Sequence, residues 1–443
     1  MFRLLRLMAP PLLLLTVLPA PAHATPERTS EFTVQTPATS VAARSDRRPV
    51  AGGLYDATAK KTFVSWAGQF EDNYAQSFDH RTNTWSTPVR VASGDSDSHN
   101  YPTMVQAKDG HLLSFRGRHN VELVLNRSPQ PHSEAGEWSE RVISKDAATY
   151  PMPFTTADGT IYVFFRETSH DLDKTIPTDT RPMQYVVSKD NGQTWQTSKE
   201  LTGQPFVIGS TSRADNMNEI YIGQLRQEPD GRVRIVYTLA GGGPEGHLHD
   251  RYHRNIYYTW FDPRNLHFYS ASGRDLGTRI DDADQEQHLK VAETPLTLPN
   301  GVKSPDYIQL VGTTFGELPF LLWFSGDEAK GPLHNYLSTW NGFRWETKEV
   351  ARGLRVREME PLNPLTWRVY ATEDGKPNVN TYLVRFGRTW SAETVIPTAK
   401  PVQRIELIKD FHDPVRILMT GASSARDVAV ADGDISVAGL TRR

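Results

Sequence analysis

One eight-residue motif constrains the fold of this chain more than any other feature of its sequence. Residues 188–195 read Ser-Lys-Asp-Asn-Gly-Gln-Thr-Trp, which places a serine, an aspartate and a glycine just before a tryptophan. Short polar side chains bond the backbone of their own turn, and glycine adopts the positive φ that many tight turns require. The motif therefore predicts a β-hairpin turn whose tryptophan packs between neighbouring sheets.

Weaker copies of this turn recur along the chain. They end at Trp85, Trp138, Phe268, Trp345 and Trp390, so that successive aromatic residues, with Trp195 in its place, stand 53, 57, 73, 77 and 45 residues apart. The segments between them are short and β-rich, and several follow an Asp-Gly pair, which is a strong hairpin signal. Long helical periodicity is absent. Irregular periods in this range fit propeller blades with variable loops.

These repeats predict an all-β fold, a β-propeller of seven four-stranded blades that forms a single domain over residues 49–443. The seven units run approximately over 50–95, 98–146, 149–203, 206–282, 300–350, 355–397 and 402–438. The last unit has no tryptophan turn. A β-sandwich with long loops is the alternative, and the repetition of Asp-Gly and Trp units makes it the weaker interpretation.

The N-terminal segment has the order of a signal peptide. Within residues 1–24, two arginines precede an apolar stretch and then Ala22-His23-Ala24, a small-x-small cleavage site. This stretch is too short and too rich in proline to span a membrane, which makes an N-terminal anchor the weaker alternative. We expect a secreted or periplasmic protein. Residues 25–48 are predicted to be a leader, in which residues 31–35 alternate like a strand.

Composition excludes several classes of function. The 443 residues contain no cysteine, which rules out disulfides, thiol nucleophiles and thiolate metal sites. A net charge of −3 gives no basic excess for nucleic acid, and no later segment is apolar enough to cross a membrane. We expect a monomer without a membrane or nucleic-acid partner.

Two His-Asn pairs form the first group of candidate site residues. His99-Asn100 and His119-Asn120 flank one predicted hairpin, with the histidines twenty residues apart. A propeller gathers the ends of its inner strands around one axial opening, so these side chains would face a common cavity. A single histidine of this kind more often bonds loop backbone, but two copies around one hairpin favour a site.

Two arginines lie close to these pairs. Arg166 ends the predicted strand 161–165, and Arg181 opens the strand that leads into the complete turn motif. A guanidinium can grip a carboxylate with two hydrogen bonds, so both arginines would suit an anionic ligand. Surface ion pairs remain the alternative for each arginine alone.

A third group follows the flexible Gly241-Gly-Gly243 segment. We expect His249, Arg251 and His253 to line a substrate cleft. The histidines of this segment could instead bind zinc, with His288 available, but the sequence shows no fourth ligand. The identity and presence of a metal stay open, with structural calcium or zinc as the options.

The motif Ser-x-Asp-x-Gly-x-Thr-Trp is the Asp-box, or BNR repeat. Together with the two His-Asn pairs, Phe165-Arg166, Arg181 and residues 253–258, it makes the chain resemble the BNR-repeat polysaccharide lyases. These include ulvan lyases and L-rhamnose-α-1,4-D-glucuronate lyases, which are seven-bladed propellers. The resemblance covers most of the chain after residue 24 and is sharp between about residues 95 and 280. The Asp-box alone is unspecific, because sialidases share it.

The resemblance implies β-elimination at a 4-O-linked uronic acid, with no cofactor required for the chemistry. Carried over by position, His119 would be base and acid, Arg181 would neutralise the substrate carboxylate, and His99 would assist. Asn120 would add a hydrogen bond. Asn100, Arg166, Tyr162, His249, Arg251 and His253 would bind the substrate, an acidic polysaccharide or oligosaccharide.

The chain departs from the ulvan lyases at one position. They use a tyrosine as a second proton-transfer group, and Phe165 stands nearest that place here. Tyr162 or another tyrosine would then substitute, or histidine would take both steps, which favours a rhamnosyl-glucuronate substrate. One alternative is a glycoside hydrolase on the same scaffold, an α-L-rhamnosidase or a sialidase-like enzyme, for which Glu71, Asp72 and Asp97 are available as carboxylates. The other is a non-catalytic glycan-binding propeller. The Arg-Ile-Pro signature of sialidases is missing.

Overall fold

Short β-strands joined by tight turns make up most of the computed structural model, which describes residues 31–43, 51–117, 119–168, 179–298, 301, 303, 306–327 and 329–441. The predicted signal peptide at 1–24 lies outside these residues. The helical segments within them have five residues or fewer: η1 (Gln69–Glu71), α1 (Ser198–Thr202), η3 (Gly243–Glu245), α2 (Asp282–Asp284) and η4 (Gln285–Leu289). The predicted all-β class is confirmed.

The two ends of the described chain meet in one nine-stranded sheet. One run of this sheet contains β28 (Val402–His412), β29 (Val415–Gly421), β30 (Gly433–Thr441) and β1 (Glu31–Ala42). The other contains β2 (Gly53–Asp56), β3 (Lys61–Ala67), β4 (Asn73–Asp79), β5 (Thr84–Trp85) and β6 (Val89–Ala92). The runs are joined where Leu54 pairs with Lys409 in parallel. Strand β1 therefore pairs not with its neighbours in sequence but with β30, from Glu31–Thr441 to Ala42–Gly433.

A seven-stranded sheet follows, and it carries one long shared strand. Its members are β7 (Thr103–Gln106), β8 (Leu112–Gly117), β9 (Val121–Arg127), β10 (Ser139–Thr155), β11 (Ile161–Glu167), β12 (Met183–Ser188) and β13 (Gln196–Thr197). The first part of β10 pairs with β9 and its last part with β11. The register between β10 and β11 shifts between Thr149 and Met152, which leaves a bulge at Tyr150 and Pro151.

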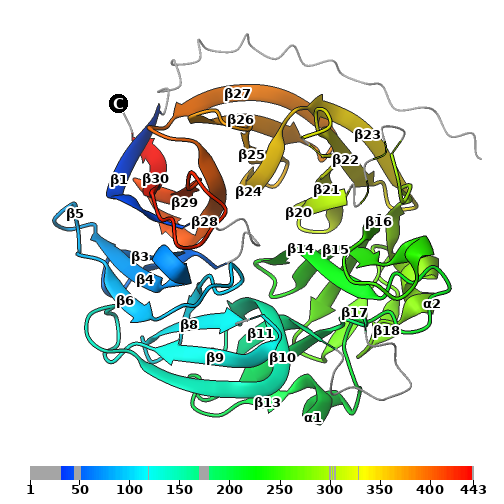
Figure 1. Ribbon diagram of the computed structural model, residues 1–443, viewed down its shortest axis with the longest axis horizontal. Coiled ribbons are helices and arrows are strands. Elements are labelled where there is room, and N and C mark those ends of the chain that lie inside the picture. The colour runs from blue at the N-terminus through cyan, green and yellow to red at the C-terminus, as the bar shows by residue number, and fades with distance from the viewer. Residues whose placement is uncertain are drawn as a thin grey trace, which may run out of the picture.

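Three further sheets complete the arrangement. The first contains β14 (Glu219–Gln227), β15 (Val233–Gly241), β16 (Tyr252–Asp262), β17 (His267–Tyr269), β18 (Asp275–Gly277) and β19 (Lys290–Ala292). The two four-stranded sheets contain β20 (Asp306–Thr314), β21 (Leu318–Ser325), β22 (His334–Trp340) and β23 (Trp345–Arg352), and then β24 (Arg355–Asn363), β25 (Thr366–Thr372), β26 (Asn378–Arg385) and β27 (Thr389–Pro397). The sheets stand in a ring around a central axis, as in a propeller (Figure 1).

The hydrophobic core is divided into clusters between packed runs of strands. Trp66 of β3 packs in one cluster with Leu418 of β29 and Ile435 of β30, which belong to the other run of the same nine-stranded sheet. Tyr370 of β25, in a four-stranded sheet, packs in another cluster with Ile417, again of β29. Strand β29 thus buries one face against β3 and the other against the sheet of β25, which removes apolar surface from water.

The complete turn motif forms the hairpin turn predicted for it. The Asp190 carboxylate accepts hydrogen bonds from the backbone N–H and the hydroxyl of Thr194 at 2.8 and 2.6 Å, and the Ser188 hydroxyl accepts the Gly192 N–H at 2.8 Å. Gly192 has a φ of +80°. The Trp195 ring meets Phe115 of β8 edge-on, with centroids 5.8 Å apart. The tryptophan therefore packs against β8 of the same seven-stranded sheet, whereas the motif predicts packing between two neighbouring sheets.

Candidate active site

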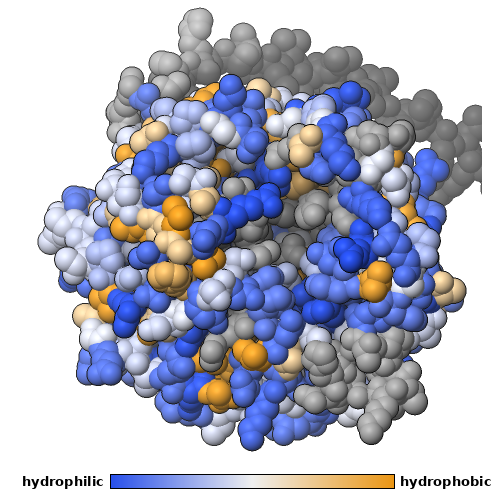
Figure 2. Space-filling model, viewed as in Figure 1, coloured by the Kyte–Doolittle hydropathy of each residue, from blue (hydrophilic) through white to orange (hydrophobic). Residues whose placement is uncertain are grey.

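The candidate residues converge from loops and strand ends that lie on one side of three sheets. The loop between β6 and β7 carries His99, the turn between β8 and β9 carries His119, and Arg166 is near the end of β11. Arg181 precedes β12 and pairs in parallel with Glu219, the first residue of β14. Hydrophilic residues surround the hollow at the centre of the face in Figure 2.

Two histidines share one carboxylate at the centre of this group. The Nδ1 atoms of His99 and His119 each face one oxygen of Asp97, and the His119 contact is 2.7 Å long. The two imidazole rings stack with centroids 3.8 Å apart and planes 19° from parallel. A carboxylate can only accept, so Nδ1 donates in both rings and Nε2 is the nitrogen left for a substrate.

Burial and charge set the protonation of this pair. Burial lowers the pKa of His119, and the nearby Arg166 and Arg181 lower it further, while the hydrogen bond and charge of Asp97 act in the opposite direction. Burial raises the pKa of Asp97, but hydrogen bonds from His99 and His119 outweigh it and bring the value to about 2. His119 is therefore neutral at pH 7 and can accept a proton.

A guanidinium is held between two aromatic rings beside the histidines. The Arg166 side chain is 1% exposed, and its Cζ lies 4.7 Å from the ring centre of Tyr150 and 4.5 Å from that of Tyr221. Burial alone would lower the pKa of Arg166, and the two phenols raise it. Tyr150 in turn lies 5.4 Å from the ring of His99. Arg166 thus places a buried positive charge next to the aromatic rings that contact the histidines.

Arg181 contacts residues from several different segments of the site. Its Nη1 donates to the side-chain oxygen of Asn120 at 3.3 Å and to the hydroxyl of Thr168 at 3.2 Å. Its Nε lies 3.5 Å from Oε2 of Glu219, whose side chain is completely buried. Burial and the charge of Arg166 lower the pKa of Arg181, and Glu219 opposes them. Arg181 is the more exposed of the two arginines and stands next to His119 through Asn120.

The loop before β16 and the start of β16 contribute two further imidazoles, His249 and His253. His249 donates through Nδ1 to Oε2 of Glu219 at 2.7 Å, and the N–H of Asp250 reaches Oε1 of the same carboxylate at 3.0 Å. His253 contacts Oδ1 of Asp250 at 2.7 Å and lies 4.8 Å from the ring of Tyr221. His249 is 43% exposed, whereas His253 is almost entirely buried.

Backbone strain concentrates at these residues. His119, Asn120, Tyr150 and Asp250 have φ values of +53°, +61°, +60° and +50°. Tyr150 also precedes Pro151, and a residue before proline favours extended backbone. Such conformations cost on the order of 1–3 kcal/mol each and persist at functional sites where the surrounding structure enforces them. The bulge in β10 directs the Tyr150 ring onto Arg166.

Three further predicted site residues differ in burial and in their contacts, which do not place them against the two histidines. Tyr162 packs with its ring stacked 5.1 Å from Phe154, and its hydroxyl donates to the carbonyl of Pro263, so the structure does not bring it to the histidines. Asn100 is completely buried, and its carbonyl accepts a hydrogen bond from Asn73 at 2.8 Å. Arg251 is exposed on the loop before β16.

The structure adds residues that sequence reasoning did not assign to this site. The sequence offers Asp97 only as a carboxylate for hydrolysis, and the other additions are Glu219, Tyr150, Tyr221 and Asp250. An Asp two residues before His99 is a local signal that could have found Asp97. No local sequence pattern indicates Glu219, because Glu219 reaches Arg181 only through the pairing of residue 181 with the start of β14.

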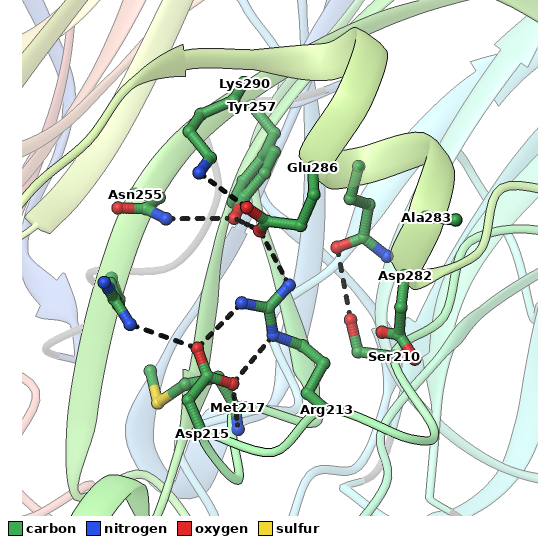
Figure 3. A network of polar contacts seen from close by, with 12 residues as sticks. Ser210, Arg213, Asp215, Met217, Asn255, Tyr257, Asp282, Ala283, Glu286 and Lys290 are labelled. Atoms are coloured by element: carbon green, nitrogen blue, oxygen red, sulfur yellow. Dashed lines mark hydrogen bonds and ion pairs between the residues drawn. The ribbon is translucent and has the colours of Figure 1, made fainter.

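A network of ion pairs supports the loops around β14 and β16 (Figure 3). Arg213 donates to both oxygens of Asp215 at 2.8 and 2.7 Å and to Glu286 at 2.8 Å. Glu286 also accepts the hydroxyl of Tyr257 at 2.9 Å, and Arg254 reaches Asp215 at 3.2 Å. The network ties the segment before β14 and the α2–η4 helical segment to β16, next to the loop that carries His249.

The three carboxylates considered for a hydrolase are either bound to other groups or buried. Asp72 accepts the N–H of Gly94 at 2.8 Å and pairs with Arg90 at 3.2 Å. Glu71 is completely buried, and Asp97 binds the two histidines. Asp97, His99 and His119 also form a group whose ligand atoms could hold a metal ion, the one such group among the described ranges.

The family of the chain follows from its sequence match. A model of the BNR repeat-containing family matches residues 61–352. The chain belongs to this family. Among the described residues of this BNR-family protein, no helix is long and apolar enough to cross a membrane.

Ulvan lyases are similar to this BNR-family chain in sequence. The ulvan lyase of family PL25 from Pseudoalteromonas sp. (strain PLSV) is 26% identical over 243 residues, which cover 48% of this chain and 47% of that protein. The ulvan lyase of Alteromonas sp. (strain LOR) is 24% identical over 250 residues, 49% of this chain and 48% of that protein. The chain spans about half the length of the curated relatives it matches.

Solved structures show the same fold over a larger part of the chain. The structure of a PL25 ulvan lyase bound to -[GlcA(1-4)Rha3S]- has a TM-score of 0.70 and 16% sequence identity, and covers 91% of this chain and 95% of that one. The polysaccharide lyase Uly1 has a TM-score of 0.59 and 12% identity over 91% and 90% of the two chains. These likenesses confirm a propeller-like architecture for the BNR-family chain.

Proposed function

We propose that this protein is a polysaccharide lyase that cleaves a 4-O-linked uronic acid by β-elimination and leaves an unsaturated uronate. The observation that carries the proposal is a neutral, carboxylate-oriented His119 next to Arg181. A base and a carboxylate-binding cation side by side are what proton abstraction next to a carboxylate requires. The names of the relatives support the same reaction class.

In the proposed reaction, Arg181 binds the uronate carboxylate and stabilises the negative charge that develops on it. This matters because the C5–H bond next to a carboxylate is a very weak acid. Nε2 of His119 removes the C5 proton, while Asp97 holds Nδ1 and so fixes the ring. His99 assists as the stacked partner, and Arg166 adds positive charge from below. The chemistry uses no cofactor.

We place the substrate among rhamnosyl-glucuronate glycans. Phe165 is completely buried and cannot transfer a proton, so the proton chemistry of an ulvan lyase with a tyrosine at this place is not reproduced. We further propose that the chain is secreted or periplasmic after removal of residues 1–24, and acts as a monomer on an acidic polysaccharide.

We propose that the sheets divide into seven blades, five with four strands and two with additional short strands, since β5 and β6 both pair with β4, and β17 and β19 both pair with β16. The strands would group as β2 to β6, β7 to β10, β10 to β13, β14 to β19, β20 to β23, β24 to β27, and β28 to β30 with β1. The antiparallel pairing within each group supports the division, and β10 would serve two blades.

Ultraviolet absorbance of the conjugated uronate tests the function. Wild-type protein incubated with rhamnosyl-glucuronate glycans should produce this absorbance together with new chain ends. His119→Ala, which removes the base, should lower the rate by at least about 100-fold while the unfolding temperature stays close to that of wild type. New reducing ends without absorbance would establish hydrolysis instead. Binding of the glycan without either signal would establish a glycan-binding protein.

A further inference from the structure

We propose that His249 is the second proton-transfer group of this site and protonates the leaving oxygen. The proposal rests on the elimination reaction proposed above and assigns its acid step to a second histidine linked to Arg181. Its basis is a buried carboxylate that binds His249 and Arg181 together.

Glu219 orients the His249 ring. Its side chain is completely buried and accepts from His249 Nδ1 at 2.7 Å and from the N–H of Asp250 at 3.0 Å. Since the carboxylate has no proton to donate, Nδ1 is the donor and Nε2 remains for the substrate. A carboxylate behind an imidazole fixes its orientation and stabilises the imidazolium in the same way as in a Ser-His-Asp triad.

The same carboxylate places His249 beside the proposed carboxylate receptor. Oε2 of Glu219 lies 3.5 Å from Nε of Arg181, and Nη1 of Arg181 bonds Asn120, the neighbour of His119. His119 is therefore linked to Nη1 of Arg181 through its neighbour Asn120, and His249 is linked to Nε of Arg181 through Glu219. A uronate bound to Arg181 would have two oriented imidazoles close to its carboxylate.

The phenols near the site are less suited to this step. Tyr150 and Tyr221 are 6% and 8% exposed, and both rings cover the guanidinium of Arg166. His253 is 4% exposed at its side chain and is bound to Asp250. His249, at 43%, is more exposed than any of them. Access to the substrate thus favours His249 over its neighbours.

The step balances without a further reactant. His119 takes the C5 proton, and the electrons of that C–H bond become the C4–C5 double bond. The C4–O4 bond breaks, its electron pair stays on the oxygen, and that oxygen takes the proton from Nε2 of His249. His119 then loses and His249 regains one proton by exchange with water, which restores the starting state.

A substrate whose leaving group needs no proton isolates this role. His249→Gln should lower kcat at least about 100-fold on the rhamnosyl-glucuronate polysaccharide. On a 4-O-(4-nitrophenyl) glucuronide, whose phenolate departs unprotonated, it should stay within a few-fold of wild type. His119→Ala should lose activity on both substrates, because the base is needed in either case.

His247→Gln is the matched control. His247 lies two residues away, is 52% exposed and contacts a carboxylate of its own, Asp179, at 3.1 Å, but this carboxylate does not bind Arg181. The control should keep wild-type kcat on both substrates. Thermal unfolding of each variant checks the fold.

The outcomes separate this proposal from the function itself. If the wild type is active, three results for His249→Gln would overturn the acid role and leave the lyase function intact. These are an unchanged kcat on the polysaccharide, an equal loss of kcat on both substrates, or a raised KM at constant kcat. A wild type that yields no unsaturated uronate from either substrate would overturn both.

Discussion

At the scale of single residues, Asp97 determines how the two histidines can act. One carboxylate accepts Nδ1–H from both rings, and the rings stack at 3.8 Å. Two imidazolium ions at this separation would repel each other, which disfavours a positive charge on both rings at once. The arrangement keeps His119 neutral and oriented while the nearby arginines hold the positive charge needed for an anionic substrate.

Replacing the shared carboxylate gives a signed pH prediction. Asp97 raises the pKa of His119 through its hydrogen bond and its charge, against the lowering by burial and by two arginines. In Asp97→Asn the pKa of His119 should therefore fall further, and the acidic limb of kcat/KM against pH should move to lower pH. The lost orientation should reduce the rate about 10–100-fold, as for other supporting residues. An acidic limb that stays in place or moves to higher pH would contradict the assigned role.

At the scale of elements, the sequence predicts hairpin turns and which residues of a strand share a face. It does not predict contacts between strand ends that are far apart in the sequence. The Asp-box and the spacing of His99 and His119 are local, so the sequence was sufficient to predict the turn and the histidine pair. Tyr162 shares a face of β11 with Arg166 but lies four residues away, which is about 13 Å along a strand. Glu219 reaches Arg181 only through the pairing of separate segments. Periodicity predicts the face of a strand, not which ends of different sheets meet.

The Asp-box turn should contribute stability but not chemistry. Asp190 accepts hydrogen bonds from the N–H groups of Gln193 and Thr194 and from the hydroxyl of Thr194. Asp190→Ala should lower the free energy of unfolding in urea by about 1–2 kcal/mol, since the lost bonds are partly replaced by water. The adjacent exposed Lys189→Ala should change it by less than about 0.5 kcal/mol. Loss of activity in Asp190→Ala without loss of stability would show that the turn has another role.

At the scale of the whole molecule, the ring depends on β1 rather than on a covalent link. The chain has no cysteine, and β1 pairs with β30 along its length although it lies within the predicted leader segment. Phe32 of β1 also packs against Tyr370 with ring centroids 6.3 Å apart, so the strand contacts the neighbouring sheet as well. Cleavage after residue 24, as predicted, would leave this strand in the protein.

Removing β1 should therefore open the ring. A chain that begins at Ala43 exposes the edge of β30, where unpaired N–H and C=O groups and apolar surface face water. We expect a lower unfolding temperature, faster proteolysis of the β28–β30 region and loss of the proposed lyase activity, because β28 pairs with β2 and packs against β3. A synthetic peptide of residues 31–42 should restore stability by adding the missing strand, while a scrambled peptide should not. Unchanged melting and activity of the shortened chain would show that the other sheets hold the ring without β1.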